Sequence, residues 1–466
     1  MRRRVAFQSI GLSIGLCAAL AGCTLAPHYE RPAAPVPAAW PQGAAYRDEV
    51  SGPAGVPWRT LVGDETLRQV IDQALANNRD LRAALANAAA ARAQYRVARS
   101  AQFPALVGTA DAIIGNGSQN TTVQPNGYDL DIGLSSFEID LFGRLKNQSR
   151  QVLETYLGTQ SGVRALRLTL VAETAEAYAG LAADQDLLKI SHDAETSRQR
   201  ALDLTQSLFQ AGLAKAVDVQ AAITLVEQAK YDIATYDKQV AQDRNALELL
   251  VGAPLPDAEL PVSLAAVDAG VAEVPAGLSS TVLLERPDVL EAEHQLKGAY
   301  AGIGAARAAF FPDITLTATA GVASPALSSL FSRGSSATSL APAASLPLLG
   351  GTAAGGLDYA KAERDYDLAT YEKTVQTAFR EVADALATRG TIKRQRDADQ
   401  HLVDAADKTA ALAEAEHKAG SGSYLNTLTA QQALLAARQG QVAAQLADID
   451  SRMALYSAIG ADPSLQ

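Results

Sequence analysis

The sequence contains two copies of one unit that lie 208 positions apart. Residues 98–106 read ARSAQFPAL and residues 306–314 read ARAAFFPDI. A repeat that keeps one register, without a net insertion, indicates two pseudo-symmetric structural units. We therefore expect a function that uses both halves of the chain. The same offset relates Asp80 to Asp288, Gly143 to Gly351, Glu173 to Glu381, Ala211-Gly212 to Ala419-Gly420, Arg244 to Arg452 and Gly252 to Gly460.

The N-terminus has the pattern of an exported lipoprotein. Three arginines at residues 2–4 precede a short apolar run that ends at Leu20, which predicts a signal peptide over residues 1–22. The sequence Leu20-Ala21-Gly22-Cys23 resembles a bacterial lipobox, in which Cys23 becomes the lipidated first residue. Thr24 stands where an aspartate would retain a lipoprotein in the inner membrane, so we expect anchoring to outer-membrane lipid. The alternative is an ordinary cleavage site beside a chance cysteine.

Composition and motifs exclude several classes of protein. The formal net charge of -11 leaves no basic footprint, so we expect no nucleic-acid partner. Cys17 belongs to the signal and Cys23 to the anchor, which leaves no disulfide in the mature chain. His192, Asp193 and Glu195 lie in a polar helical stretch without further ligands, and no nucleophile motif or zinc spacing occurs. We therefore expect no catalytic residue, no metal and no cofactor.

Proline-rich segments divide the mature chain into parts. Seven prolines fall within residues 24–57 and four within residues 253–277. Such segments are typical of extended linkers. We predict a lipid-anchored N-terminal segment at 23–57, repeat one at 58–252, a linker at 253–277 and repeat two at 278–466.

Each repeat begins with an alanine-rich helix and continues with two strands. The helices are predicted at residues 64–100 and 286–308, because a Phe-Pro pair follows each one and the residue before proline leaves the α conformation. Alternation of apolar and polar residues predicts two strands within 104–142 and two within 312–349. The apolar phase flips at Ser135-Ser136, which suggests a bulge.

A long helical stretch without proline completes each repeat, at residues 144–251 and 352–460. The part from 144 to 211 would form a helix of roughly 100 Å. Gly212 and Gly420 interrupt the stretches near their middles, and a turn there folds each stretch into an antiparallel hairpin. Seven-residue spacing of apolar side chains predicts coiled-coil packing. These positions are Tyr156, Val163, Leu170 and Ala177; Val219, Val226, Ile233, Val240 and Leu247; and Leu428, Leu435, Val442, Ile449 and Tyr456.

Four strands cannot close a membrane barrel within one chain. Closure needs about eight strands, and an open edge in lipid leaves backbone groups unpaired. Two chains would give eight strands with little lumen, whereas three would give twelve and room for a pore. We therefore predict a mainly α fold with a small membrane β-barrel: a long antiparallel coiled-coil α-barrel plus four strands per chain, completed in a trimer. The alternative is two β-hairpins that cap a periplasmic coiled coil without a pore.

Several segments carry a family pattern. They are the lipobox, Cys-Thr-Leu-Ala-Pro-His-Tyr-Glu-Arg-Pro at 23–32, Phe-Glu-Ile-Asp-Leu-Phe-Gly at 137–143, and the two Ala-Gly turns. Together they resemble the outer membrane efflux protein family, the TolC-like outer membrane factors, and within it the NodT-type lipoproteins. The resemblance covers essentially the whole mature chain. It implies a homotrimer with a twelve-stranded barrel above a periplasmic helical tunnel. It also implies two partners, a periplasmic adaptor (membrane fusion) protein and an inner-membrane efflux transporter.

The resemblance further implies that the hairpin turns dock the adaptor. The alternative is that they are plain turns between helices. The residues concerned are Gly212, Leu213, Gly420 and Ser421.

Family members often carry acids just past these turns, beside a constricted periplasmic aperture. Asp218 fits that pattern, but Asn426, Thr429 and Gln432 stand where Asp, Asp and Arg are common. This departure argues against an Asp/Arg gate. We expect the aperture to close through packing and neutral hydrogen bonds, with Leu425 near the constriction.

These observations predict an outer-membrane exit duct of a tripartite efflux pump, with its helical part in the periplasm. It would conduct small molecules passively and have no enzymatic step. A duct of the same build for type I protein secretion stays open as an alternative, because substrate choice lies mainly with the pump. The alternative from another class is a non-channel scaffold lipoprotein that bridges the envelope with coiled coils.

Overall fold

The computed structural model describes residues 24–46, 55–114, 126–275 and 279–465. The predicted signal peptide and Cys23 lie outside these ranges. The described residues form two compact units, each built from parts of both repeats. Unit one comprises the described residues up to Ala33 and those within Asn87–Gln160 and Glu291–Glu372. Unit two comprises the described residues within Ala34–Ala86, Ser161–Leu290 and Lys373–Gln466.

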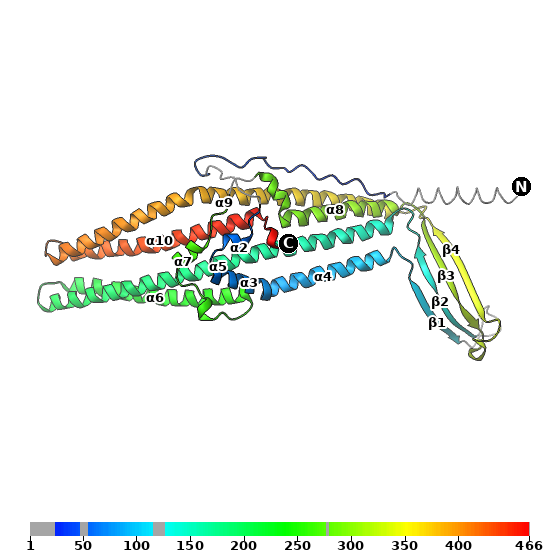
Figure 1. Cartoon of the computed structure of the whole chain (residues 1–466), viewed down its shortest axis with the longest axis horizontal. Coiled ribbons are helices and arrows are strands. Elements are labelled where there is room, and N and C mark those ends of the chain that lie inside the picture. Colours follow the sequence, from blue (N-terminus) through cyan, green and yellow to red (C-terminus); the bar gives the residue numbers. More distant parts are fainter. Residues whose placement is uncertain (1–23, 47–54, 115–125, 276–278, 466) are drawn as a thin grey trace. The chain divides into compact units, whose positions relative to one another are not determined.

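The helices of the two repeats share their boundaries (Figure 1). Each first and last residue in one repeat is matched by a residue 208 positions further along the chain. The sequence repeat therefore carries into the fold at every long helix. The matched helices are α4 (Arg79–Ser100) and α8 (Pro287–Ala308), α5 (Arg144–Gln210) and α9 (Thr352–Lys418), and α6 (Ala216–Val251) and α10 (Tyr424–Ile459).

The predicted long helices and their coiled-coil packing are confirmed. α5 and α9 each run for 67 residues, and α6 and α10 each run for 36. The heptad side chains Val226, Leu247 and Ile449 are at most 2% exposed. Within the described ranges, no helix combines the length and the apolar character needed to cross a membrane.

Glycines end both second hairpin helices. Gly252 (φ 73°) and Gly460 (φ 69°) adopt the left-handed conformation that glycine tolerates best. At Gly252 an added Cβ would also lie 2.7 Å from the backbone oxygen of Asn77. Both the conformation and the space therefore require glycine at this position.

The prediction of one continuous helix at 64–100 was wrong. The structure has α3 (Glu65–Asn77) and α4, separated by Asn78 in an extended conformation. The side-chain oxygen of Asn78 accepts a hydrogen bond from the N–H of Leu81 at 2.9 Å, and its amide donates to the backbone oxygen of Leu250. An asparagine that offers such bonds competes with the helix. Arg286, the equivalent residue in repeat two, is extended as well and precedes α8.

The strands form one antiparallel sheet in unit one, in the order β1-β2-β3-β4. The predicted bulge is confirmed, because the register between β2 and β3 shifts between Leu134 and Phe137, and Ser136 has a φ of 48°. Within the described chain, β1 and β4 each pair on one side only. The strands are β1 (Leu106–Ile114), β2 (Asn126–Glu138), β3 (Asp313–Ser324) and β4 (Ser336–Ser345).

Short elements pack between the long helices of unit two. An antiparallel bridge joins Val62 to Val271, and hydrogen bonds flank it from Gly63 to Gly270 (2.6 Å) and from Ala272 to Leu61 (2.7 Å). These elements are α2 (Trp58–Leu61), α3, η1 (Asp257–Glu259), α7 (Leu264–Gly270), η2 (Ser280–Glu285) and η4 (Pro463–Leu465); η3 (Leu327–Ser329) belongs to unit one.

Candidate functional site

The first hairpin turn ends α5 in a Schellman motif. Gly212 has a φ of 74°, and its N–H donates to the backbone oxygen of Phe209 at 3.0 Å. The N–H of Leu213 donates to the backbone oxygen of Leu208 at 2.8 Å. These two bonds satisfy the last carbonyl groups of the helix.

The second turn repeats this motif at the end of α9. Gly420 also has a φ of 74°, and its N–H donates to the backbone oxygen of His417 at 3.0 Å. Ser421 donates in the same way to Glu416. The two predicted turns are therefore confirmed as structures, while their role in docking stays a prediction.

Asp218 and Asn426, two of the predicted aperture residues, each lie in the first turn of the helix that follows a hairpin turn. The carboxylate of Asp218 accepts a hydrogen bond from the backbone N–H of Lys215 at 3.0 Å, which caps α6. A negative charge near a helix N-terminus is also favoured by the helix dipole. Asn426 is the equivalent residue in α10, where Ser423 is the cap.

The remaining aperture candidates are exposed on one face of α10. Leu425 is 68% exposed, and Thr429 and Gln432 are exposed as well. Residues three and four apart are neighbours on a helix surface, so these three side chains come together. Asp218 belongs to α6 instead. Leu213, in the first turn, is 77% exposed.

Sequence reasoning missed further exposed apolar side chains near the turns. Leu204 (49% exposed) and Leu412 (66%) are equivalent in the two repeats, and Val217 (66%) is the equivalent of the predicted Leu425. A single exposed leucine follows no local pattern. Its recurrence after 208 positions was the signal that could have identified it.

One apolar cluster joins the two hairpins of unit two. Its buried members come from the first hairpin, and Tyr424, the first residue of the second hairpin's α10, packs against it. The members are Leu202 of α5, Ala222 and Val226 of α6, and the partly buried Val219, Ile223 and Tyr424.

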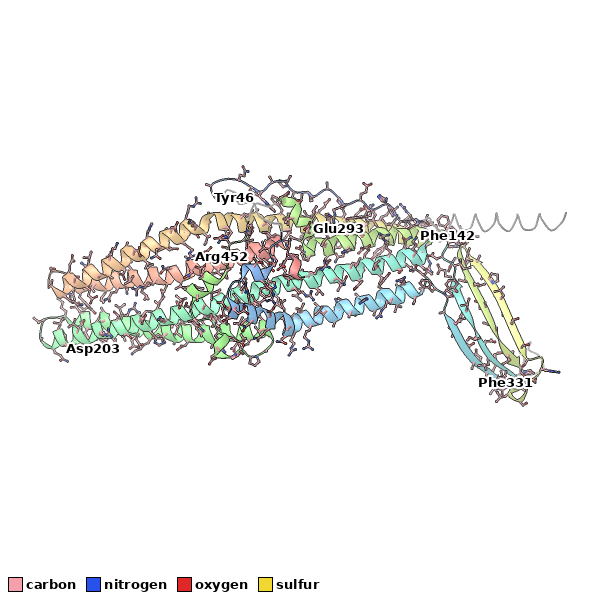
Figure 2. All side chains as sticks on the ribbon, in the orientation of Figure 1. Tyr46, Phe142, Asp203, Glu293, Phe331 and Arg452 are labelled. Carbon is pink, nitrogen blue, oxygen red and sulfur yellow. The ribbon has the colours of Figure 1, made fainter. Side chains whose placement is uncertain are left out.

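A buried carboxylate holds the N-terminal segment in unit one. Figure 2 labels Glu293, which belongs to α8. It pairs with Arg31 at 2.5 Å and Lys297 at 3.0 Å, and it accepts a hydrogen bond from the Tyr29 hydroxyl at 2.9 Å. Burial alone would raise the pKa of Glu293, but the hydrogen bonds outweigh it and lower the pKa to about 2. Sequence reasoning missed this clamp because Arg31 and Glu293 are 262 positions apart.

The start of the same segment lies against the beginning of α5. The Thr24 hydroxyl donates to the side-chain oxygen of Asn147 at 3.0 Å, and Arg307 donates to the backbone oxygen of Leu25 at 3.0 Å. Asn147 follows the end of β2 by nine positions. The first described residue is therefore fixed beside the junction between strand and helix.

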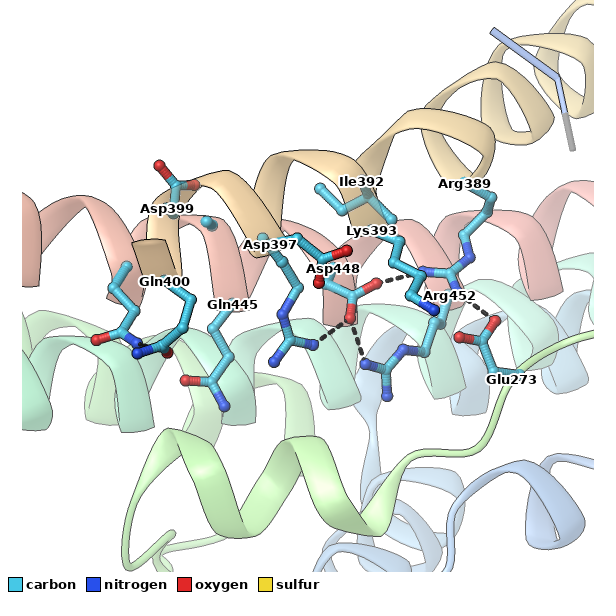
Figure 3. A pocket seen from close by; sticks show the side chains of 13 residues that line it. Glu273, Arg389, Ile392, Lys393, Asp397, Asp399, Gln400, Gln445, Asp448 and Arg452 are labelled. Atoms are coloured by element: carbon cyan, nitrogen blue, oxygen red, sulfur yellow. Dashed lines mark hydrogen bonds and ion pairs between the residues drawn. The ribbon is translucent and has the colours of Figure 1, made fainter. Parts of the chain in front are cut away.

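An ion-pair network joins α7, α9 and α10 in unit two (Figure 3). Asp448, whose side chain is 7% exposed, pairs with Arg396 at 2.5 Å, with Arg452 at 2.6 Å, and with Arg389. Arg452 also pairs with Asp268 of α7. Burial alone would raise the pKa of Asp448, but hydrogen bonds from Arg452 and Arg396 outweigh it and hold the pKa below its usual range.

The network lines a hollow of about 400 Å³ that carries charges of both signs. The four basic groups are balanced by four acidic ones, so the hollow offers no net charge to a ligand. Across the described residues, no group of three or more His, Cys, Asp or Glu side chains could hold a metal ion. The charged lining residues are Arg389, Lys393, Arg396 and Arg452, and Glu273, Asp397, Asp399 and Asp448.

Two partly buried carboxyl pairs lie elsewhere in unit two. Burial, together with the charges of Asp450 and Glu173, raises the pKa of Glu176 to about 7. Burial raises the pKa of Asp450 to about 6. Burial and a hydrogen bond with Asp243 raise the pKa of Asp184 to about 7. The pKa values of Glu176, Asp450 and Asp184 therefore lie closer to neutral pH than those of ordinary carboxyl groups.

Long paired helical hairpins, together with one antiparallel sheet to which each repeat contributes two strands, define this protein as an outer-membrane channel with a periplasmic helical part. The chain belongs to the outer membrane efflux protein family, whose model matches residues 70–253 and 278–461.

Relatives of known name and structure support this assignment over nearly the whole chain. The probable efflux pump outer membrane protein TtgC of Pseudomonas putida is 42% identical over 95% of this chain and 93% of its own. The crystal structure of CusC matches with a TM-score of 0.85 and 36% identity, covering 94% of this chain and all of the other. The open state of the MtrE channel of Neisseria gonorrhoeae matches with a TM-score of 0.85 and 31% identity, covering 95% and 100%.

We predict that the substitution Asp448→Asn destabilises the protein by about 1.5–3 kcal/mol. The buried Arg389 and Arg452 lose the carboxylate that they share, and each keeps only one other, Glu273 or Asp268. The measurement is the midpoint of thermal unfolding in detergent at one scan rate. Asp397→Asn is the matched control, since Asp397 lines the same hollow but is exposed. The control should stay within about 0.5 kcal/mol of the parent. Equal midpoints for both variants would contradict the role of the network.

We also predict a loss of stability as the pH rises from 4.5 to 7. The pKa of Glu176 is about 7 in the folded protein against an ordinary 4.5, so the folded state binds more protons in this window. One proton contributes at most about 1.4 kcal/mol per pH unit, and partial exposure reduces this.

Glu176→Gln tests this effect. Without the carboxyl group, the unfolding midpoint should fall less between pH 4.5 and 7 than it does in the parent protein. Asp193→Asn, at an exposed position of the same helix, should leave the slope unchanged. An unaltered slope in Glu176→Gln would show that this carboxyl does not cause the pH dependence.

Proposed function

We propose that this protein is the outer-membrane exit duct of a tripartite efflux pump. It conducts small molecules passively from an inner-membrane transporter and a periplasmic adaptor to the outside. The observation that carries the proposal is the repeated arrangement of two long hairpins and a sheet with two open edges, in a member of the efflux family. A duct of this kind has no catalytic step, and its energy comes from the inner-membrane partner.

The open sheet edges argue for a homotrimer. β1 and β4 leave backbone N–H and C=O groups without strand partners, and such groups cost several kcal/mol each in lipid. Pairing β4 of one copy with β1 of the next removes the edges. Three copies supply twelve strands, which leaves room for a lumen that eight strands would not.

A lipid anchor at Cys23 fits the position of the residue that follows it. Thr24 is hydrogen-bonded to Asn147 in the first turn of α5, just past β2. If the strands span the outer membrane, this junction is the level at which a lipid on Cys23 reaches the inner leaflet. The clamp at Glu293 then holds the segment along α8.

The two hairpin turns are the proposed docking sites for the adaptor. Their Schellman motifs give Gly212 and Gly420 fixed backbone shapes, and an added Cβ at either glycine would meet nothing within 4 Å. The exposed Leu213 beside the first turn offers apolar contact, and Ser421 offers a hydroxyl at the second. The adaptor surface that fits these turns has an apolar patch facing Leu213 and a polar patch facing Ser421.

The proposed aperture lies just past these turns. Leu425, Asn426, Thr429 and Gln432 are neutral, and the one acid, Asp218, is engaged in capping α6. Constriction therefore depends on apolar packing and neutral hydrogen bonds. Leu425, with 68% of its surface free in the single chain, is the side chain that contributes most to packing.

The protein mass of the lipidated, detergent-extracted particle, measured by light scattering, tests the duct. We expect three copies, because only then do the strands close around a lumen. A mass spectrum of the N-terminal peptide from the same sample tests lipidation of Cys23. A stable monomer with full lipidation would overturn the duct and favour a scaffold lipoprotein.

The substitution Leu425→Ala tests the aperture. We expect a severalfold higher single-channel conductance in planar bilayers, because a smaller side chain widens an apolar constriction. Val217→Ala is the matched control, since Val217 is the equivalent residue in repeat one and is similarly exposed. Unchanged conductance in Leu425→Ala would remove this residue from the constriction.

A further inference from the structure

Each hairpin of unit two is held together by its own buried polar contact. In the first hairpin, Arg198 of α5 is 7% exposed and donates to the backbone oxygen of Leu225 in α6 at 2.9 Å. In the second, Thr427 of α10 is 3% exposed and its hydroxyl donates to the backbone oxygen of Ala413 in α9 at 3.0 Å. Breaking either contact would leave a buried donor unpaired, so each hairpin moves as one body near its turn.

Tyr424 connects these two bodies. Its ring packs against the apolar cluster whose other members all belong to α5 and α6, including Leu202 and Val226. The ring of His417, across the second turn, lies 5.3 Å from the ring of Tyr424 between centroids. In repeat one, the residue equivalent to Tyr424 is the exposed Ala216. The first hairpin therefore has no matching ring that packs against the second.

The hydroxyl group of Tyr424 destabilises the contact that its ring makes with the first hairpin. The hydroxyl oxygen is buried and has no hydrogen-bond partner among the described residues. A buried polar group without a partner destabilises the state in which it is buried, and water restores its hydrogen bonds once it is exposed. The ring therefore favours hairpins in contact, and the hydroxyl favours hairpins apart.

We propose that Tyr424 is a positioning residue that sets the balance between joined and separated hairpins beside the aperture. In the joined state the aromatic ring fills the cluster and the second hairpin lies against the first. In the separated state the hydroxyl is hydrated and the turns move apart. The consequence for opening rests on the proposed duct function, whereas the contact between hairpins does not.

Two substitutions at Tyr424 should act in opposite directions. Tyr424→Phe removes the unpaired hydroxyl and keeps the ring, so it should favour the joined state by about tenfold, the equivalent of about 1.4 kcal/mol. Tyr424→Ala removes the ring and should favour the separated state by a similar factor. A residue that merely stabilised the fold would not shift the balance in both directions.

The measurement is the distance between the two turns, by pulsed electron paramagnetic resonance on full-length, lipidated protein in detergent. Spin labels are attached at Leu213→Cys and Ser421→Cys, which are exposed positions in the two turns. Singly labelled samples give the contribution from neighbouring copies. Single-channel conductance is recorded on unlabelled protein carrying the same Tyr424 substitutions.

The matched control is Tyr371→Phe. Tyr371 is fully buried, and its hydroxyl also has no partner among the described residues, but it belongs to unit one. This variant should raise the thermal unfolding midpoint, as Tyr424→Phe should, yet leave both the distances and the conductance unchanged.

The outcomes separate the contact from the duct. Shorter distances and lower conductance in Tyr424→Phe, with longer distances and higher conductance in Tyr424→Ala, support the proposal. Distances that do not change in Tyr424→Phe, or that change equally in Tyr371→Phe, overturn it even if the parent protein conducts. The two Tyr424 variants could also shift the distance in opposite directions in a particle that never conducts. That result would support the contact between the hairpins. It would overturn both the proposed duct and the role of Tyr424 in opening it.

Discussion

This structure depends on one constraint: a single chain cannot pair the two edge strands of its own sheet. Four strands give three antiparallel ladders and two edges, and the edge strands carry exposed apolar residues such as Ile114 and Leu340. In water an edge of this kind invites pairing, and in lipid it is too costly to leave open. This constraint is the physical basis of the homotrimer proposed above.

The two repeats solve the same packing problem with different chemistry. In repeat two, Arg389, Arg396 and Asp448 form the buried ion-pair network, whereas the equivalent residues in repeat one are Leu181, Leu188 and Val240. Leu181 is fully buried. Replacing charges by apolar side chains of similar volume is often neutral or stabilising, so the network is no simple gain in stability. It does bind α7, from the linker, to the second hairpin through Asp268. The pseudo-symmetry is thus kept in the boundaries of the three matched pairs of long helices, and it is broken in the side chains of this network.

Most of the fold could be predicted from the sequence, because the signals are local and repeated. Absence of proline defined the long helices, and Gly212 and Gly420 marked the turns, which the left-handed conformation explains. The break at Asn78 could not be predicted, because it depends on Leu250, which is 172 positions away. The same holds for the clamp at Glu293, whose partners Tyr29 and Arg31 come from the N-terminal segment.

The candidate site was predictable only in part, for a related reason. Motif spacing identified the turns and the polar positions after them, but burial decides what a side chain does there. Asp218 was predicted as an aperture acid, and the structure adds that its carboxylate caps α6.

Tyr424, by contrast, was not predicted as a site residue. It is the first residue of α10, yet its ring packs against the other hairpin. A helix start combines a fixed backbone with a side chain free to lean away from its own helix. That combination lets one residue report on, and bias, the distance between two rigid bodies. The proposed aperture has neutral side chains where an Asp/Arg gate would stand, so an aromatic contact between the hairpins can set the balance instead.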